Sequence, residues 1–257
     1  MNTTDQTIQA AIRRFASGGA RRSVAVQRLE DGAPLLHEAG HAPRPAASVI
    51  KLALAIAAEE AFQANRLNGD ETRRVADLPD TRYASVIHGL SPDHRLSLRE
   101  MLHLTLITSD NPMTTCLLDA VGMAAVNAVL RRLAAHPESR MDVGFDETAL
   151  GPRGRANRLT AADAIALMAH IHAHYPTLEA ALASSLRNTR LSLFLDEDWH
   201  APHKTGSLNG VVNDVGMVAH KGRGFLIAVL TDGEADPVAT ARTIGTLARA
   251  VADAVLV

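Results

Sequence analysis

Hydrophobic residues near the N-terminus follow first a helical and then a strand pattern. Apolar side chains within residues 8–15 recur at the spacing of an amphipathic helix. Two short apolar segments, 23–29 and 35–38, then flank Asp31-Gly32, a dipeptide typical of β-hairpin turns. The first part of the chain therefore predicts one helix followed by a hairpin.

The rest of the chain predicts a helical middle and a second group of strands. Apolar residues recur at helical spacing in six segments, 48–65, 98–107, 112–120, 123–135, 160–173 and 177–187. Strands are predicted at 203–209, 212–220 and 224–231, and a closing amphipathic helix at 236–255. Strands at both ends predict an α+β protein. We expect a single unit, 1–257, with an α/β sandwich lobe from about 1–45 and 190–257 and an all-helical lobe from about 46–189.

The composition of the chain limits the kinds of molecule that the protein is expected to bind. With 257 residues, 47% of them hydrophobic, the chain can bury a large core. A net charge of −2 gives no electrostatic reason to bind nucleic acid or an anionic membrane, and no run of 18 apolar residues suggests a membrane span. The single cysteine, Cys116, lies in an apolar helical segment, which is typical of a buried small side chain. We expect a monomer that acts on a small molecule.

The first six residues are polar and acidic, unlike a secretory signal. The expectation is a cytoplasmic protein, or a periplasmic or secreted one if an export signal has been removed.

Lysine is rare in this chain and lies where chemistry would need it. Only three of the 26 basic residues are lysines, and one of them is in Ser48-Val49-Ile50-Lys51. Arginine stays protonated, whereas a desolvated lysine amine beside other cations can act as a base. Residues three apart share a helix face, so the Lys51 amine is expected beside the Ser48 hydroxyl, with free N–H groups of the helix start nearby. The alternative is a capping serine followed by an ordinary helical lysine.

Two further motifs carry polar residues at the ends of apolar segments. Ser109-Asp110-Asn111 ends a buried helix and predicts a turn whose side chains bond locally or point into a cleft. Lys204-Thr205-Gly206-Ser207 precedes the apolar segment 211–218 and predicts an edge strand, where the glycine lets a ligand approach the backbone. Each motif alone is also compatible with a purely structural turn or strand.

The order of the three motifs is more specific than any one of them. Ser-x-x-Lys, then Ser-Asp-Asn, then Lys-Thr-Gly in a chain of this length resembles the class A serine β-lactamases and the penicillin-binding proteins. The likeness continues around the motifs, in Leu98-Arg99-Glu100-Met101, in Cys116-Leu117-Leu118-Asp119-Ala120-Val121-Gly122 and in Trp199. The resemblance implies a five-stranded antiparallel sheet flanked by helices, which fits the predicted lobes.

The resemblance also implies catalytic roles. Ser48 would be the acylated nucleophile and Lys51 its activating partner. Ser109 would relay a proton to the leaving nitrogen, with Lys204 close enough to tune it.

Substrate-binding roles follow in the same way. Asn111 would bind the substrate's amide side chain. Thr205, Gly206 and Ser207 would contact the substrate, the two hydroxyls through its carboxylate, and the N–H groups of Ser48 and Ser207 would form an oxyanion hole. Asp110 is expected to brace the turn.

The deacylation base is where the chain departs from the family. Class A enzymes carry Glu-x-x-Leu-Asn, with an arginine two residues before the glutamate. Here Glu147 and the leucine fit, but Gly151 stands in place of the asparagine, Phe145 in place of the arginine, and the loop is shorter. Glu147 is therefore either the base or a solvated loop glutamate, with Asp146 a weaker candidate.

A second departure concerns the carboxylate pocket. Many class A enzymes place an arginine on the strand after the Lys-Thr-Gly strand, and the matching position here is about Phe225. Arg223, two residues earlier, would share its strand face and could substitute. The alternative is a solvated turn arginine.

The histidines do not suggest a metal site. Of His170, His172 and His174, only the first and last share a helix face, and no further ligand is obviously placed to complete a site. We expect no metal and no other cofactor.

Three functions remain open. The first is a class A-type serine hydrolase that opens β-lactams. The second is a related acyl-serine amidase, esterase or D-amino-acid peptidase acting on another substrate. The third is a protein that is acylated by a β-lactam and releases it slowly.

Overall fold

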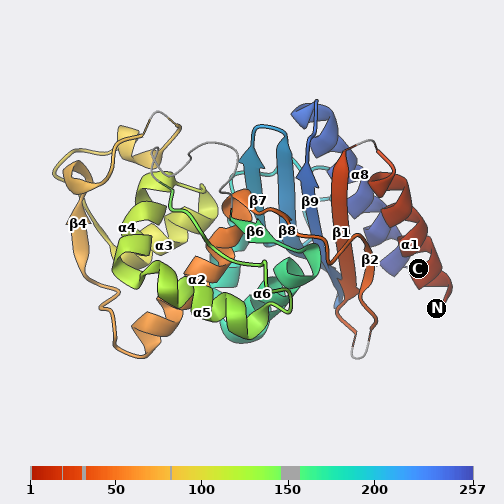
Figure 1. The fold of residues 1–257 in the computed structure, drawn as a ribbon, viewed down its shortest axis with the longest axis horizontal. Helices are drawn as coiled ribbons and strands as arrows, with labels where there is room; N and C mark the ends of the chain where they lie inside the picture. Colours follow the sequence, from red (N-terminus) through yellow and green to blue (C-terminus); the bar gives the residue numbers. More distant parts are fainter. Residues whose placement is uncertain (1, 19, 31–32, 82, 146–156, 257) are drawn as a thin grey trace.

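A five-stranded antiparallel sheet in the order β2-β1-β9-β8-β7 confirms the predicted α+β fold (Figure 1). The computed structural model describes residues 2–18, 20–30, 33–81, 83–145 and 157–256. The strands are β1 (Arg21–Arg28), β2 (Leu36–Glu38), β7 (His203–Leu208), β8 (Val211–His220) and β9 (Arg223–Asp232). The first two come from one end of the chain and the other three from the other end. Strand β7 lies at the edge, as its sequence predicts.

Alternation along the strands gives the sheet two buried faces. Phe225, Ile227 and Val229 of β9 pack in one cluster with α1 (Thr3–Ala16) and α8 (Pro237–Leu256). Leu226, Ala228 and Leu230 belong to a second cluster, shared with the helical lobe. Both faces exclude water, and the β-branched and aromatic residues of these strands fit such a pleated, buried surface.

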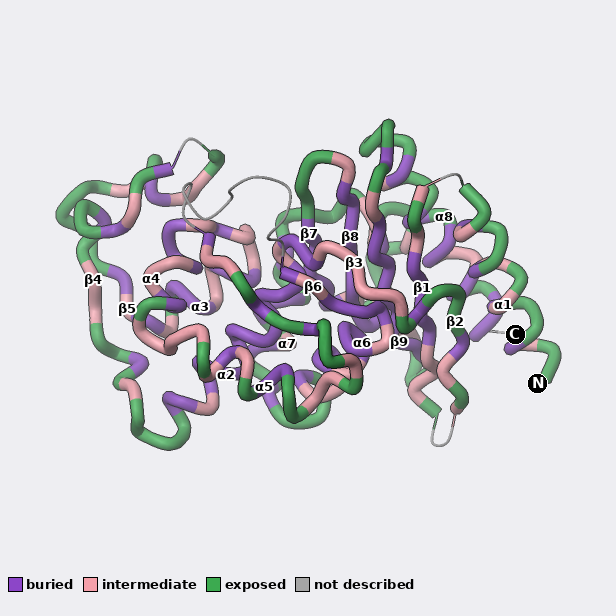
Figure 2. Tube along the Cα trace, in the orientation of Figure 1, coloured by how far each residue is buried: buried purple, intermediate pink, exposed green. Residues whose placement is uncertain are grey.

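The helical lobe surrounds one buried helix, α2 (Lys51–Gln63). Around it lie α3 (Leu98–Ile107), α4 (Asn111–Val121), α5 (Met123–Leu133), α6 (Ala161–His174) and α7 (Pro176–Ala183), with α6 also packing on the sheet. Residues 52–58 of α2 are apolar on all sides of the helix, which is the composition of a core helix. Buried chain is accordingly concentrated at the middle of this lobe and along the sheet (Figure 2).

Short elements join the lobes and cover their edges. Three are 3₁₀ turns, η1 (Ala47–Ile50), η2 (Val75–Asp77) and η3 (Val86–Gly89), and two are small ribbons, β3 (Arg44–Pro45) with β6 (Arg158–Leu159) and β4 (Thr72–Arg74) with β5 (Arg95–Ser97). In the described part of the chain, no single helix is long and apolar enough to cross a membrane, although α4 and α5 pass that test together despite an 87° bend between them.

Three predicted elements differ in detail from the structure. The segment predicted as one helix at 48–65 begins with the 3₁₀ turn η1. Helix α7 ends at Ala183, before the predicted 187, because the N–H of Leu186 bonds to Ile107 O at 3.1 Å and draws the chain toward α3. β1 and β2 do pair as a hairpin, but Val26 lies opposite Leu36, so the connection is longer than a two-residue turn; Asp31-Gly32 itself lies outside the described residues.

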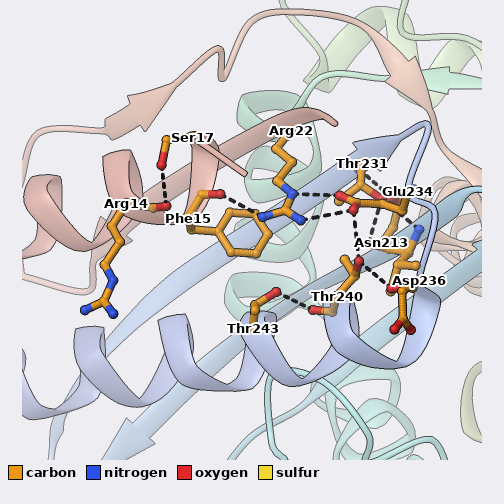
Figure 3. Close-up of polar contacts among 11 residues, drawn as sticks. Arg14, Phe15, Ser17, Arg22, Asn213, Thr231, Glu234, Asp236, Thr240 and Thr243 are labelled. Carbon is orange, nitrogen blue, oxygen red and sulfur yellow. Dashed lines mark hydrogen bonds and ion pairs between the residues drawn. The ribbon is translucent and has the colours of Figure 1, made fainter. Parts of the chain in front are cut away.

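One buried side chain ties the sheet to the η1 turn. Asn213 of β8 donates from Nδ2 to Pro45 O at 2.8 Å and to Ala46 O at 3.2 Å. Its Oδ1 accepts from the N–H of Thr231 at 2.8 Å, a contact visible in Figure 3. Because Ala46 immediately precedes η1, the Asn213 amide holds this turn at a fixed distance from the sheet.

We predict that Asn213→Ala lowers the free energy of unfolding by about 2–4 kcal/mol, because it leaves a buried N–H and buried carbonyls without partners. Urea denaturation monitored by circular dichroism measures this change. A loss below about 0.5 kcal/mol, within the range of ordinary surface substitutions, would show that the amide does not hold η1.

Candidate active site

Ser48 lies in the η1 turn with its side chain half-exposed. Residues three apart eclipse in a 3₁₀ turn, so Ser48 and Lys51 share one side of it, and the Lys51 N–H bonds to Ser48 O. The residue before Ser48, Ala47, has a φ of 48°, a left-handed conformation that costs energy for a residue with a Cβ. Among the described residues, the Ser48 hydroxyl has no hydrogen-bond partner, so it is open to a substrate.

The Lys51 amine joins the first motif to the second. Its Nζ lies 2.8 Å from Ser109 O, 2.9 Å from Asn111 Oδ1 and 3.3 Å from Ser109 Oγ. Ser109 has a φ of 63°, which turns the chain sharply between α3 and α4. Lys51 is 0% exposed, although the side chains it contacts are only half-buried. The amine is therefore buried against the Ser109 turn, which lies next to the η1 turn that carries Ser48.

Asp110 braces this turn, as predicted. It is the N-cap of α4 and accepts a hydrogen bond from the N–H of Met113 at 3.2 Å. Its other oxygen accepts from Ser85 Oγ at 2.6 Å and from the N–H of Val86 at 3.0 Å. The carboxylate is 1% exposed and fully occupied by protein groups, so it positions Ser109 and Asn111 rather than contacting a ligand.

The third motif brings β7 against the segment that carries Ser48. A Cβ on Gly206 would lie 2.9 Å from Ala46 O and 3.1 Å from Ser48 N, so only glycine lets the strand come this close. The expectation that this glycine makes room for a ligand is thus modified, because the backbone that approaches it belongs to η1. On either side, Thr205 is buried and Ser207 is exposed.

Lys204 places a second buried amine beside this site. It is 1% exposed, and its Nζ donates to Thr205 O at 3.0 Å. Burial lowers the pKa of Lys204 to about 7, against an attraction from Asp214 and with further repulsion from Arg187 and Arg190. Burial also lowers the pKa of Lys51 well below its ordinary value, and the positive charges of Lys204 and Arg187 act in the same direction while Asp110 opposes them. Both buried amines therefore release their protons more readily than an exposed lysine does.

An aromatic ring covers the Lys51 amine on its remaining side. The Lys51 Nζ lies 4.6 Å from the ring centroid of Phe145, which is 8% exposed. This ring keeps water away from the amine. The residues that follow it, including Asp146, Glu147 and Gly151, lie outside the described part of the chain, so the proposed base remains a prediction.

Arg223 is not part of this site, and the expectation that it replaces a substrate-binding arginine is wrong. The strand after β7 is β8, and the residue opposite Gly206 is Asn213. Phe225 and Arg223 lie one strand further on, in β9, with Phe225 buried against α1 and α8. Arg223 is exposed and pairs with His220, at the end of β8 remote from Asn213. This position fits the alternative interpretation, that Arg223 is an arginine of a turn.

Two arginines that no sequence motif identified lie beside the second and third motifs instead. Arg190 donates to Gly206 O at 2.8 Å and also to Asn213 O and Ser207 Oγ. Arg187 donates to Thr108 O at 3.2 and 3.3 Å, next to Ser109. Both come from the irregular segment after α7, which has no motif of its own. Only their folding against β7 and α3 identifies them.

A buried polar pair supports the underside of β7. His203 Nδ1 lies 3.0 Å from Asp214 Oδ1, and the N–H of Leu191 donates to Asp214 Oδ2 at 3.1 Å. Both side chains of the pair are almost fully buried. The pair therefore links β7 and β8 to the segment that carries Arg190.

Two of the helical histidines have rings in contact, and the third bonds to Glu179. His170 and His174 have ring centroids 4.5 Å apart, and His172 Nδ1 lies 2.7 Å from Glu179 Oε2. Within the described ranges, no group of three His, Cys, Asp or Glu side chains is arranged to hold a metal ion.

Comparison with known proteins gives a family and a fold. The sequence model of the beta-lactamase enzyme family matches residues 3–255. Among solved structures, the beta-lactamase from Sphaerobacter thermophilus DSM 20745 superposes with a TM-score of 0.86 at 24% identity, covering 98% of each chain. The TLA-1 extended-spectrum beta-lactamase gives 0.87 at 22% identity, covering 99% of this chain and 100% of that one. The structure of PBP-A gives 0.82 at 23% identity, covering 99% and 96%. No curated protein matched the sequence.

We predict that in Gly206→Ala the acylation of Ser48 by benzylpenicillin is slower by at least about tenfold, a change of about 1.4 kcal/mol in the barrier. The reason is that the methyl group pushes β7 away from Ser48 N. The matched control is Gly89→Ala, since a Cβ there meets nothing within 4 Å. Acylation followed by intact-protein mass spectrometry makes the measurement, and equal rates in both variants would contradict the close packing.

The lowered pKa of Lys204 predicts that the free energy of unfolding rises with pH. Between its folded pKa of about 7 and the ordinary 10.5, the unfolded chain holds a proton that the folded chain has released. Stability therefore increases across this window, by up to about 1.4 kcal/mol per pH unit for one group, and Lys51 acts in the same direction. Urea unfolding at pH 7, 8 and 9 should show a smaller slope for Lys204→Met than for the wild type. An unchanged slope would mean that Lys204 is charged in the folded protein.

Proposed function

The chain belongs to the beta-lactamase enzyme family, and we propose that it is a serine hydrolase of the class A type, opening a β-lactam amide through an acyl-enzyme on Ser48. The observation that carries the proposal is the fully buried Lys51 amine, which comes one 3₁₀ turn after Ser48 in the chain and lies within hydrogen-bond reach of Ser109. An ordinary helical lysine extends its charged amine into water, whereas this amine is buried against the Ser109 turn.

The hydrogen bonds of Lys51 suit a neutral amine. A neutral amine has two N–H donors, and two pure acceptors, Ser109 O and Asn111 Oδ1, lie at 2.8 and 2.9 Å. Its lone pair is then free to take a proton. In the proposed reaction, Lys51 removes the proton of the Ser48 hydroxyl, and Ser48 Oγ bonds to the substrate carbonyl carbon.

Breakdown of the tetrahedral intermediate uses the neighbouring serine. As the carbonyl re-forms, the carbon–nitrogen bond breaks, and the leaving nitrogen takes the proton of the Ser109 hydroxyl. Ser109 Oγ recovers a proton from Lys51, 3.3 Å away. The N–H groups of Ser48 and Ser207 are proposed to stabilise the oxyanion, since Gly206 brings β7 against Ser48 N. The second buried amine, Lys204, contributes a positive electrostatic potential at Ser109 only while the Lys204 amine itself is protonated.

Recognition of the substrate carboxylate is proposed to involve Thr205, Ser207 and Arg190. Arg190 already donates to Ser207 Oγ, so its charge lies at the hydroxyl that would contact the carboxylate. Arg187 adds a second positive charge beside Ser109. Asn111, whose Oδ1 is held by Lys51, keeps its amide N–H₂ for the substrate's amide side chain.

A second function is favoured by the departures around Glu147. Phe145 stands where class A enzymes have an arginine, and Gly151 where they have an asparagine, so a hydrolytic water would have fewer anchors. The protein would then be acylated and would release the product slowly. A variant of PBP-A has been solved as an acyl-enzyme complex with penicillin G, and it superposes here with a TM-score of 0.80 at 22% identity. A related amidase, esterase or D-amino-acid peptidase activity would use the same Ser48 chemistry on another substrate.

We expect the wild-type protein to hydrolyse nitrocefin, and Ser48→Ala to lower the turnover number by at least about 1000-fold. Intact-mass analysis after mixing with benzylpenicillin should show no lasting adduct on the wild type. Glu147→Gln should accumulate one, because acylation survives without the base.

Each other outcome has its own meaning. A lasting adduct on the wild type without turnover would establish the slow-release function. If the protein shows no turnover and forms no adduct, a β-lactam is ruled out as the substrate. Labelling of Ser48 by a fluorophosphonate would then show whether this serine is reactive at all.

A further inference from the structure

A cleft of about 450 Å³ lies on the sheet lobe, away from Ser48. Its walls are the C-terminal end of α1, the start of β1 and the chain between β2 and β3. Four arginines line it, Arg13, Arg21, Arg22 and Arg44, with Ala16, Ser17, Ala20, Glu38 and Ala39. A volume in this range holds a small molecule.

Two of the four arginines have their charge balanced by the protein. Arg22 bonds to Glu234 at 2.7 and 3.0 Å and to Phe15 O at 2.9 Å, and its guanidinium lies 4.7 Å from the centre of the Phe15 ring. Thr240 holds the same glutamate at 2.9 Å, so this wall of the cleft is fixed by a network (Figure 3). Arg21 pairs with Asp232. These contacts balance the charges of Arg21 and Arg22.

The other two arginines have no such partner. Within the described chain, neither Arg13 nor Arg44 forms an ion pair, and Glu38 pairs with none of the four. Arg44 is half-buried, and its Nε is fully buried without a hydrogen-bond partner. Burial and the positive charges of Arg21 and Arg158 lower the pKa of Arg44, while Asp232 opposes them. A guanidinium that has no ion-pair partner and is held against other cations is a site that an anion would stabilise through the outer N–H groups of the fork.

We propose that this cleft binds a small molecule with two anionic groups, either phosphates or carboxylates, through Arg13 and Arg44. Two unpaired guanidiniums match two anionic groups, and the planar fork of each can bind an oxyanion with two parallel hydrogen bonds. The site is distinct from the cleft at Ser48 and does not depend on the proposed hydrolase function.

The site is connected to the catalytic segments through the backbone. Arg44 pairs with Leu159 across the β3–β6 ribbon, and the N–H of Ala46 bonds to Asn157 O at 2.7 Å. The chain that follows Arg44 leads directly into the η1 turn with Ser48. An anion bound at Arg44 therefore reinforces the strand from which the nucleophile turn begins.

Calorimetric titration with sodium pyrophosphate and, separately, sodium malonate tests the proposal at constant ionic strength set with sodium chloride. We expect saturable binding of at least one of the two to the wild type, with pyrophosphate and malonate distinguishing a phosphate from a carboxylate ligand. Arg13→Gln and Arg44→Gln should each weaken the affinity at least tenfold. The control is Arg14→Gln, which removes the same charge from an exposed neighbour on α1 that points away from Arg22 (Figure 3).

Arg13 is exposed, so its substitution tests the site even if Arg44→Gln impairs folding. Three results would overturn the proposal: no saturable binding of either probe, equal weakening by Arg14→Gln, or binding that survives both Arg13→Gln and Arg44→Gln. The last result would place the anion at another group of basic residues, such as Lys204, Arg187 and Arg190.

Discussion

Burial of the Lys51 amine is the constraint around which the catalytic half of the molecule is arranged. A charged amine is costly to remove from water, and a second buried amine, Lys204, adds repulsion. The protein lowers this cost by supplying two carbonyl-type acceptors and by letting the amine lose its proton. The same burial lowers the pKa of the amine, so the arrangement that limits the cost of burial also suits the proposed role of Lys51 as a base.

The strained and small residues of the site follow from that burial. Ser109 adopts a positive φ so that both its carbonyl and its hydroxyl face Lys51, and Asp110 is buried to hold that turn in place. Gly206 lets β7 reach the η1 turn, and Asn213 holds the turn to the sheet. Strain of this kind persists only where the surroundings over-determine the backbone. Two lobes built from distant parts of the chain are needed to do so.

The sequence predicted the helices and strands well where periodicity is strong, and the resemblance of its three motifs grouped Lys51 with Ser109 and Asn111, which the structure brings into contact. The helix at 98–107 and the edge strand with Lys204 were predicted from local pattern alone. Arg223 was misplaced because the match was counted along the chain, whereas a position opposite Gly206 is set by β7–β8 pairing, which selects Asn213. Arg187 and Arg190 escaped notice because their segment has no periodicity and their function comes from long-range contacts.

The central claim is that Lys51 is a neutral amine in the folded protein, and its protonation can be observed directly. The chain has only three lysines, so NMR of protein labelled at the lysine side chains gives three assignable signals, with exposed Lys221 as the internal reference. We predict that Lys51 titrates well below the ordinary 10.5, because burial and the neighbouring positive charges disfavour its charged form. A Lys51 signal that stays protonated up to its ordinary pKa would contradict it.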